Sequence, residues 1–260
     1  EISPDGAALL GFCEVENRNV VEDLVKQKAI KDRNYQIVHY ESPDFRGIDV
    51  ALLYSKDEYK LISKDFIRID FPTSVVENYT TRDILYVTGT YNEKETLHIF
   101  VNHWPSRRGG EERSRPKRIA AAKISKHLVD SLQVIDPYSK IFIMGDLNDN
   151  PTNKSVKNIL KAKKDRKKVG LKGIYNPMEN FYKNGVGTNA YRDNWNLFDQ
   201  IMITKPLLEK NYSSFRFYKA GVFNKNYLLH KNGKYKGYPF RSFSNGNFTT
   251  GFRDHLPVYV

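Results

Sequence analysis

Cysteine is nearly missing from this sequence of 260 residues, because Cys13 is its only one. A single thiol cannot form a disulfide within the chain, and without a cysteine pair or a His-x-x-x-His spacing we do not expect a zinc site. No apolar run approaches the roughly 20 residues that a membrane-spanning helix needs, and no signal peptide is visible, so we expect a soluble protein. The sequence begins at Glu1, which leaves open a preceding segment or an export leader; the compartment is undetermined.

Acidic residues are also scarce relative to basic ones. The 30 Asp and Glu stand against 42 Lys and Arg, which gives a formal net charge of +12. Such a surplus favours polyanionic partners, such as nucleic acid, phosphorylated substrates or acidic membrane surfaces. A hydrophobic content of 40% is enough for a substantial core. No repeat, linker or low-complexity segment is visible, so we expect residues 1–260 to form one domain and a monomer.

Short apolar runs dominate the pattern and predict many strands and few helices. The expected extended segments cover residues 8–13, 35–40, 48–54, 60–70, 84–91, 96–101, 141–144, 197–204, 215–218 and 255–260. Helices are expected over residues 19–29, capped by Asn17 or Asn19, over 156–162, and after a loop at 102–115, with Pro116 in the first turn. Many strands with few helices predict two packed sheets with helices outside them.

The chain is organised around residues 141–151, Ile-Phe-Ile-Met-Gly-Asp-Leu-Asn-Asp-Asn-Pro. Four apolar residues predict a strand covered on both faces, Gly145 interrupts it, and Asp-Asn-Pro closes it as a turn. If the strand geometry continues, the side chains of Asp146 and Asn148 point to the same side. A carboxylate beside a carboxamide can hold a water molecule or a hard cation. The alternative is an ordinary polar turn.

Other polar residues stand at predicted strands where packing does not explain them: Glu14 and His103 follow strands, Asp199 lies inside an apolar one, and Asp254 and His255 precede the last apolar residues. Each has a plain structural alternative: a helix cap, a hydrogen-bonded histidine, an ion pair or a turn. Their shared placement at strand ends favours a functional site. Carboxylates suit Mg²⁺ or Mn²⁺, a carboxylate can orient an imidazole, and a second histidine can transfer a proton.

Two basic segments have open interpretations. The loop at 105–115 carries Arg107 and Arg108 beside two glycines. Arginine forks suit phosphate oxygens, and glycines permit close backbone approach, so the loop is either a substrate contact or a solvated loop. The basic run at 161–168 indicates a solvated helix end or loop, with nucleic-acid contact as the alternative.

Five motifs, in order and spacing, resemble the endonuclease/exonuclease/phosphatase superfamily, which includes pancreatic-type deoxyribonucleases, abasic-site endonucleases, neutral sphingomyelinases and inositol polyphosphate phosphatases. They are Cys-Glu-Val-Glu-Asn at 13–17, Asn-His-Trp at 102–104, Gly-Asp-Leu-Asn-Asp at 145–149, Phe-Asp-Gln-Ile at 198–201 and Asp-His-Leu-Pro-Val at 254–258. Residues 46–54 and 103–110 resemble a bacterial branch of unassigned substrate. The resemblance covers nearly the whole chain. It implies a four-layered α/β/β/α sandwich, with two mostly antiparallel sheets and the site at one end.

The resemblance also implies roles by position. Glu14 is similar to the glutamate that binds Mg²⁺ or Mn²⁺, and Asp254 to a further metal or water ligand. Asp146 resembles the residue that orients or deprotonates the attacking water, with Asn148 beside it. Three arginines, Arg46, Arg107 and Arg108, are expected to bind substrate.

Two histidines complete the expected site. His255 resembles the histidine that contacts the scissile phosphate, held by Asp199. His103 matches a histidine of the deoxyribonuclease and phosphatase branches, where a proton must reach the leaving oxygen; it argues against the abasic-site branch. Departures are the family's first strand and helix, which do not precede Ala8, and Arg253 in place of serine, which either contacts phosphate or points to solvent.

These observations predict a metal-dependent phosphoester hydrolase that cleaves by direct attack of water. The positive charge favours a nuclease acting on nucleic acid. The alternative is a phosphatase or phosphodiesterase acting on small phosphoesters, such as inositol phosphates or sphingomyelin-type head groups, because the same core chemistry serves both. A binding module that has lost activity is the third hypothesis.

Overall fold

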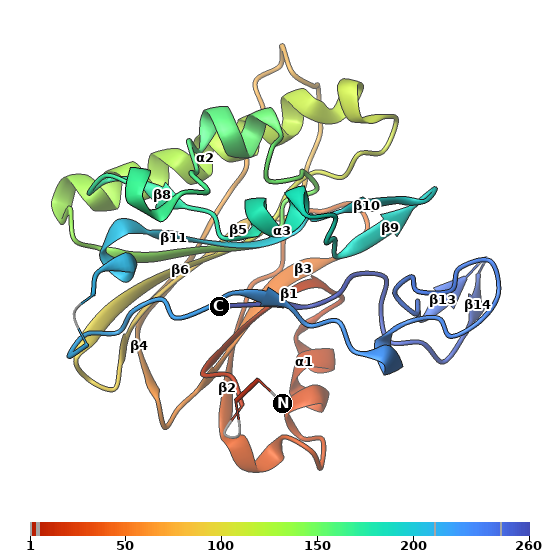
Figure 1. Cartoon of the computed structure of the whole chain (residues 1–260), viewed down its shortest axis with the longest axis horizontal. Helices are drawn as coiled ribbons and strands as arrows, with labels where there is room; N and C mark the ends of the chain where they lie inside the picture. Colours follow the sequence, from red (N-terminus) through yellow and green to blue (C-terminus); the bar gives the residue numbers. More distant parts are fainter. Residues whose placement is uncertain (1, 4–5, 211, 245) are drawn as a thin grey trace.

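Two β-sheets form the body of the protein in the computed structural model, which describes residues 2–3, 6–210, 212–244 and 246–260 (Figure 1). The smaller sheet has the order β1 (Leu9–Val15), β3 (Asp49–Ser55) and β2 (Tyr35–His39). The larger sheet has the order β4 (Tyr59–Ile67), β5 (Ile84–Tyr91), β6 (Glu95–His103), β7 (Lys140–Asp146), β11 (Asp199–Thr204) and β8 (Ile174–Tyr175). All neighbouring pairs in these two sheets are antiparallel except β6 and β7.

The remaining elements are α-helices, two-stranded pairs and single helical turns. The α-helices are α1 (Arg18–Val25), α2 (Glu111–Ile135) and α3 (Met178–Lys183). Two-stranded pairs are formed by β9 (Asn189–Tyr191) with β10 (Asn194–Asn196), β12 (Gly221–Val222) with β15 (Val258–Tyr259), and β13 (Phe243–Ser244) with β14 (Asn247–Phe248). Single helical turns are η1 (Lys31–Arg33), η2 (Ser155–Ile159), η3 (Arg166–Lys168), η4 (Lys205–Leu208) and η5 (Asn226–Leu228).

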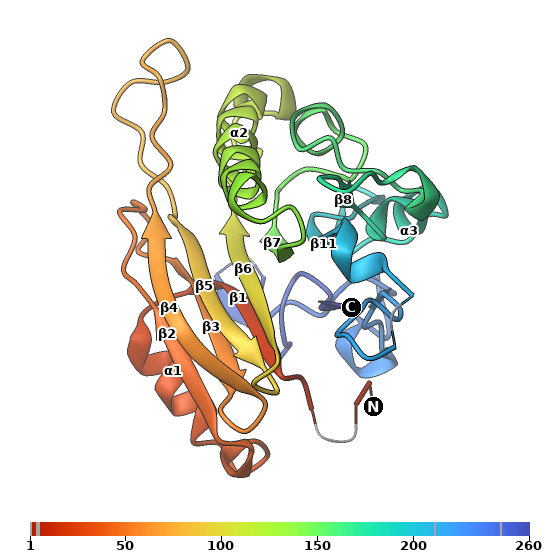
Figure 2. The same ribbon diagram turned by 90° about the vertical axis from the view of Figure 1, so that its left-hand side faces the viewer.

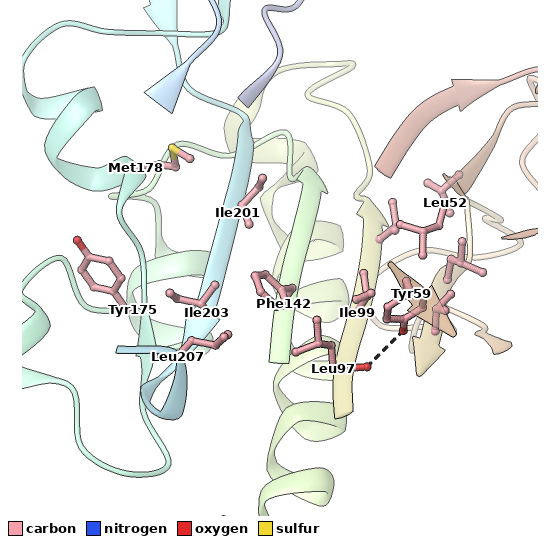
Figure 3. Close-up of a cluster of buried hydrophobic side chains, with 14 of the residues drawn as sticks. Leu52, Tyr59, Leu97, Ile99, Phe142, Tyr175, Met178, Ile201, Ile203 and Leu207 are labelled. Carbon is pink, nitrogen blue, oxygen red and sulfur yellow. Dashed lines mark hydrogen bonds between the residues drawn. The ribbon is translucent and has the colours of Figure 1, made fainter. Parts of the chain in front are cut away.

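The two sheets pack face to face because successive side chains of a strand point to opposite faces. On β3, Leu52 joins the core between the sheets, whereas Leu53 joins the core under α1. On β7, Phe142 faces the other sheet and Ile143 faces α2. Figure 3 shows part of the core between the sheets, with side chains from β3, β6, β7 and β11.

Each outer face of the pair of sheets is covered by a helix (Figure 2). Helix α1 buries Val21 against the smaller sheet, and Asn17 caps it by accepting a hydrogen bond from the Val20 amide at 3.2 Å. Helix α2 buries Ala121, Ala122 and Val129 against the larger sheet. These layers form the expected α/β/β/α sandwich. None of the helices in the described ranges has the length and apolar character needed to cross a membrane.

Several local predictions differ from the structure; the helix expected over 156–162, for example, is only the turn η2 at Ser155–Ile159. Residues 215–218 form no strand. The ring of Phe215 instead packs on Tyr91 and Phe142, at 4.7 and 6.3 Å between ring centroids. Helix α2 begins at Glu111, so Pro116 lies inside it and not in its first turn. The extended segment that follows residue 59 ends as a strand at Ile67, short of residue 70.

Candidate active site

Three of the predicted residues stand side by side because of strand register. His103 ends β6, Asp146 ends β7 and Asp199 begins β11, and the ladders pair Asp146 with each of the other two. Two residues farther into each strand lie Val101, Met144 and Ile201, whose side chains contact the core between the sheets. The three polar side chains therefore lie on that same inner face, where the core ends.

A glycine makes this close arrangement possible. Gly145 has a φ of +127°, a region that side-chain-bearing residues rarely adopt. A Cβ atom built on it would lie 1.9 Å from the carbonyl oxygen of Asn102 on β6. The Gly145 before Asp146 thus permits the strand ends carrying His103 and Asp146 to meet.

His255 reaches this row from the C-terminal segment. Its Nδ1 lies 2.7 Å from Oδ2 of Asp199, so the carboxylate orients the ring. Burial alone would lower the pKa of His255, but Asp199, with Asp146 and Asp254, raises it to about 10. Burial would raise the pKa of Asp199, yet the charge and hydrogen bond of His255 bring it below its usual value. The pair is therefore an imidazolium and a carboxylate at neutral pH.

Asp146 and His103 form the second acid–imidazole pair, with 3.5 Å between Oδ2 and Nε2. Burial raises the pKa of Asp146 to about 6, with His255 opposing and Asp199 adding to the rise. Burial and the charges of Arg82, Arg46 and His255 hold the pKa of His103 well below its usual value. His103 is therefore neutral, whereas His255 is charged.

Asn148 lies beside Asp146, but not through continued strand geometry. The strand ends at Asp146, and Asn148 has a left-handed φ of +49°. Its amide N–H donates to Oδ1 of Asp146 at 2.8 Å, and its side-chain amide donates to the carbonyl of Trp104 at 3.0 Å. The expectation of an extended Asp-x-Asn is wrong, because a turn brings the second residue back onto the carboxylate of the first.

A buried ion pair missed by the sequence analysis supports this turn. Arg82 donates to Oδ2 of Asp44 at 2.9 Å and to the carbonyl of Trp104 at 2.6 Å, and both charged side chains are at most 2% exposed. The same carbonyl holds Asn148. Sequence offered no local signal, because the partners of Arg82 lie 38 and 22 residues away.

Arg107 is held by the loop that follows β7. Its guanidinium donates to the Asn148 carbonyl at 2.8 Å and to Oδ1 of Asp149 at 3.1 Å, and it lies 4.6 Å from the centre of the Phe198 ring. Asp149 also pairs with Arg118 of α2 at 2.7 Å. These contacts position the loop behind Asp146, so contact between Arg107 and substrate stays a prediction.

Arg46 and Arg108 lie with Glu14 at the rim. Glu14 occupies a bulge at the end of β1, with a φ of +61°, and its half-exposed carboxylate lies 3.6 Å from Nη1 of Arg46. The exposed Arg108 lies 6.0 Å from the ring of Phe45, itself 66% exposed. Glu14 therefore faces a cation in this structure, and does not cap α1, a role taken by Asn17.

The end of β1 lies over the row on the larger sheet. The thiol of Cys13 donates to the carbonyl of Asn102 at 3.4 Å. Burial raises the pKa of Cys13 to about 12, with the charge of Asp146 contributing. Cys13 directly precedes Glu14, so the glutamate begins at the edge of the same site. Asp254 directly precedes His255, and its charge helps to raise the pKa of His255.

Two groups of residues have the chemistry to hold a divalent cation. Glu14, which follows Cys13, and Asp254, which precedes His255, offer the carboxylate oxygens that Mg²⁺ and Mn²⁺ prefer, but in the described residues neither belongs to a cluster of three close ligand atoms. Within the part of the chain that is described, His39, Glu41 and Asp49 have ligand atoms within 4.8 Å of one another. In that group, Nε2 of His39 and Oδ2 of Asp49 are hydrogen-bonded to each other at 3.1 Å.

The sandwich fold, with carboxylates and histidines at its strand ends, agrees with the class that the motifs predict. That class is the phosphoesterases of the endonuclease/exonuclease/phosphatase superfamily. The sequence model of the Endonuclease/Exonuclease/phosphatase family matches residues 1–260, and the chain belongs to this family. No curated protein sequence matches it significantly.

Solved structures share the fold at low sequence identity. A truncated Caenorhabditis elegans TDP2 is 17% identical, with a TM-score of 0.61 over 98% of this chain and 83% of that one. Danio rerio TDP2 complexed with a single-strand DNA product is 12% identical, with 0.59 over 96% and 84%. A mannosyl-6-phosphatase of Bacteroides thetaiotaomicron is 15% identical, with 0.59 over 96% and 83%.

Proposed function

We propose that this protein is a divalent-metal-dependent phosphoester hydrolase and acts as a nuclease. The observation that carries the proposal is the row of His103, Asp146 and Asp199 with His255 bonded to its end. The row places a carboxylate of raised pKa between a neutral and a charged imidazole, which is a set able to move a proton and to stabilise negative charge.

Asp146 is the base in this proposal. With a pKa of about 6 in the buried row, it is ionised at neutral pH and still accepts a proton readily. The amide of Asn148 occupies its Oδ1 at 2.8 Å, which leaves Oδ2, on the His103 side, to take a proton from the attacking water. Water activated in this way attacks phosphorus directly, and no covalent intermediate is required.

His255 stabilises the charge that develops on the phosphoryl oxygens. Its Nδ1 donates to Asp199, so its Nε2–H is the group offered to the substrate. Arg46, at the rim beside Glu14, is a second cationic donor. These groups are fixed before substrate arrives, which is what electrostatic stabilisation of a transition state requires.

His103 takes a different role from the one expected. A neutral imidazole of lowered pKa is a poor proton donor at neutral pH, so we assign it to orienting Asp146, which it faces at 3.5 Å. The leaving oxygen then takes its proton from solvent. Glu14 and Asp254 would hold the cation, which when bound would stabilise charge on a phosphate oxygen.

A nuclease is favoured over a small-phosphoester enzyme by the net charge of +12. A structural neighbour complexed with a single-strand DNA product is consistent with it. The second candidate, a phosphatase or phosphodiesterase of small esters, has the mannosyl-6-phosphatase neighbour in its support. Both share the same catalytic row.

A substrate panel with Mg²⁺ and Mn²⁺ separates the two candidates. It contains plasmid DNA, single-stranded DNA, RNA, bis-p-nitrophenyl phosphate, sphingomyelin, inositol phosphates and a mannose phosphate, with a chelator control. A nuclease should cleave nucleic acid at a rate that falls steeply between about 50 and 200 mM salt, whereas a small ester should respond weakly. Cleavage of small esters alone would replace the nuclease assignment, and inertness toward all substrates with either metal would refute the hydrolase.

A further inference from the structure

The segment between β12 and Asp254 has an unusual composition. Over residues 223–253 it contains six basic residues, eight Phe and Tyr residues and no Asp or Glu. The basic ones are Lys225, Lys231, Lys234, Lys236, Arg241 and Arg253. We call residues 223–253 the basic aromatic segment. In Figure 1 it lies at one side of the molecule, with β13 and β14 farthest out.

Backbone hydrogen bonds tie this segment together up to its last residue, Arg253. The amide of Phe240 donates to the Leu228 carbonyl at 2.7 Å, and the Phe240 carbonyl accepts from the amides of Phe252 and Arg253 at 2.8 and 3.1 Å. Arg253 is followed directly by Asp254 and His255. Because the main chain makes these links, side chains on the surface of the segment can be changed without removing them.

The segment contains a pocket of about 500 Å³ whose wall is largely aromatic. Tyr227, His230, Phe240 and Phe252 line it. Tyr227 and Phe252 pack edge to face with 5.9 Å between centroids, and His230 and Phe240 do so at 4.7 Å.

The aromatic wall is accessible and has polar groups beside it. Tyr227 is 49% and Phe252 58% exposed. Lys231 and Asn232 also line the pocket, so a cation and an amide stand beside the rings. Large aromatic side chains left this accessible in a hollow are typical of a binding site.

We propose that this pocket binds a base of a single-stranded nucleic acid whose backbone leads into the catalytic row. The inference rests on the proposed nuclease function and adds the form of its substrate. Aromatic walls stack on bases, since every base has a π-face, and lysines and arginines attract the phosphates. Both single-stranded DNA and RNA offer this chemistry; a base paired in a duplex cannot enter the pocket without flipping out.

The distance to the catalytic row suits one strand. Phe252 and His255 are three residues apart, so their Cα atoms are at most about 11 Å from each other. Successive phosphates of one strand advance about 3.4 Å along a duplex axis, so a few nucleotides span this separation. Phe252 can therefore contact a base while a nearby phosphodiester of the same strand lies at His255.

The shape of the site favours a strand over a membrane surface, which the positive charge alone would also attract. A bilayer is served by apolar side chains that project from a surface. Here the rings of Tyr227 and Phe252 instead line a hollow with Lys231 and Asn232 beside it. A hollow of this kind fits a single ring with its attached phosphate.

Binding is measured apart from catalysis, by fluorescence anisotropy of labelled oligonucleotides in EDTA. The probes are single-stranded DNA, single-stranded RNA and duplex DNA, with anionic phospholipid vesicles measured by sedimentation. Tyr227→Ala should weaken single-strand binding roughly 5- to 150-fold, as loss of a stacked base does. Tyr227→Phe keeps the ring and should bind single strands as the parent does. Lys231→Ala should reduce the slope of log affinity against log salt by about 0.7.

The matched controls are Tyr138→Ala and Lys28→Ala. Tyr138 is 67% exposed and lies just before β7, at the end of that strand opposite Asp146, and Lys28 is an exposed lysine that follows α1. Both controls should bind single strands as the parent does. All variants should keep the parent's melting temperature and its rate on bis-p-nitrophenyl phosphate, because none changes the catalytic row.

The outcomes separate this inference from the proposed function. It is overturned if Tyr227→Ala binds single strands like the parent, if duplex binding falls as much as single-strand binding, or if vesicle binding alone is lost. A parent that hydrolyses bis-p-nitrophenyl phosphate but binds no single strand also overturns it, while the hydrolase stands. A parent that binds single strands through Tyr227 but cleaves no phosphoester refutes the proposed function and leaves the pocket assignment intact.

Discussion

The substitution Asp44→Asn tests how a buried ion pair supports the turn beside Asp146. Asn has the shape of Asp but no charge, so the change removes the partner of Arg82 without opening a cavity. The Arg82 and Asp44 side chains are 2% and 0% exposed, and Arg82 also donates to the Trp104 carbonyl. After substitution the guanidinium stays in place and faces an amide where a carboxylate stood.

The expected loss is large because a buried charge is left uncompensated. Removing one partner of a buried pair costs about 3–5 kcal/mol. For a chain of this length a loss of 1 kcal/mol lowers the melting temperature by about 2 °C, so the expected decrease is roughly 6–10 °C. By contrast, Glu22→Gln removes the carboxylate of an exposed pair with Arg18 on α1 and should cost less than about 1 kcal/mol.

Chemical denaturation of Asp44→Asn, Arg82→Met and the double variant tests this reasoning. The double variant removes both charges, so it should be less destabilised than the sum of the single variants, by about 1–3 kcal/mol. If Asp44→Asn loses no more stability than Glu22→Gln, or if the single effects simply add, the ion pair does not hold this part of the fold together.

Three further predictions concern the glycine, the acid limb and the metal. Gly145→Ala should lower the free energy of unfolding by more than about 3 kcal/mol and abolish activity, because its Cβ would lie 1.9 Å from the Asn102 carbonyl. The control Gly47→Ala, at a φ of +64° with open space, should lower it by only about 1–2 kcal/mol. Equal losses of the two variants in urea unfolding would contradict this. Burial would raise the pKa of Glu95, but hydrogen bonds from Lys140 and the Phe215 amide lower it. Its stabilisation is therefore present above the unfolded pKa of about 4.3 and lost as pH falls through the folded value. Glu95→Gln should therefore lower the urea midpoint more at neutral pH than in acid below the folded pKa, and a decrease that does not change with pH would refute the shift. In crystals soaked with Mn²⁺, anomalous density should lie at Glu14 and Asp254, and density at His39, Glu41 and Asp49 alone would move the metal site.

Local sequence patterns predicted the sandwich because its strands alternate. Runs such as residues 141–144 contribute alternate side chains to two cores, which is why they are apolar throughout. The same reasoning failed at 215–218, where the partly buried Phe215 packs on the core from a loop and not from a strand. An apolar residue predicts burial, but it does not predict the backbone conformation, which depends on the surrounding chain.

The candidate site was predictable where a residue ends a strand. His103 and Asp146 end β6 and β7, Asp199 begins the antiparallel β11, and strand register brings the three together. The motif resemblance added their roles. Neither the strand pattern nor the motifs could identify Asp44 or Arg82, because each residue acts through an ion pair with a partner far along the chain. The turn at Asn148 was missed because a left-handed backbone reverses the direction that strand periodicity predicts.

Asp146→Asn is the substitution that tests the proposed catalytic row most directly. The measurement is the turnover rate on the best substrate of the panel, at saturating Mg²⁺ or Mn²⁺, with Asp65→Asn, at an exposed carboxylate of β4, as the control. We predict that Asp146→Asn lowers kcat by about 10²- to 10⁴-fold, the usual contribution of a general base, with an unchanged melting temperature for the control and its activity retained. An Asp146→Asn protein that turns over as fast as the parent would contradict the assignment of the row as the catalytic centre.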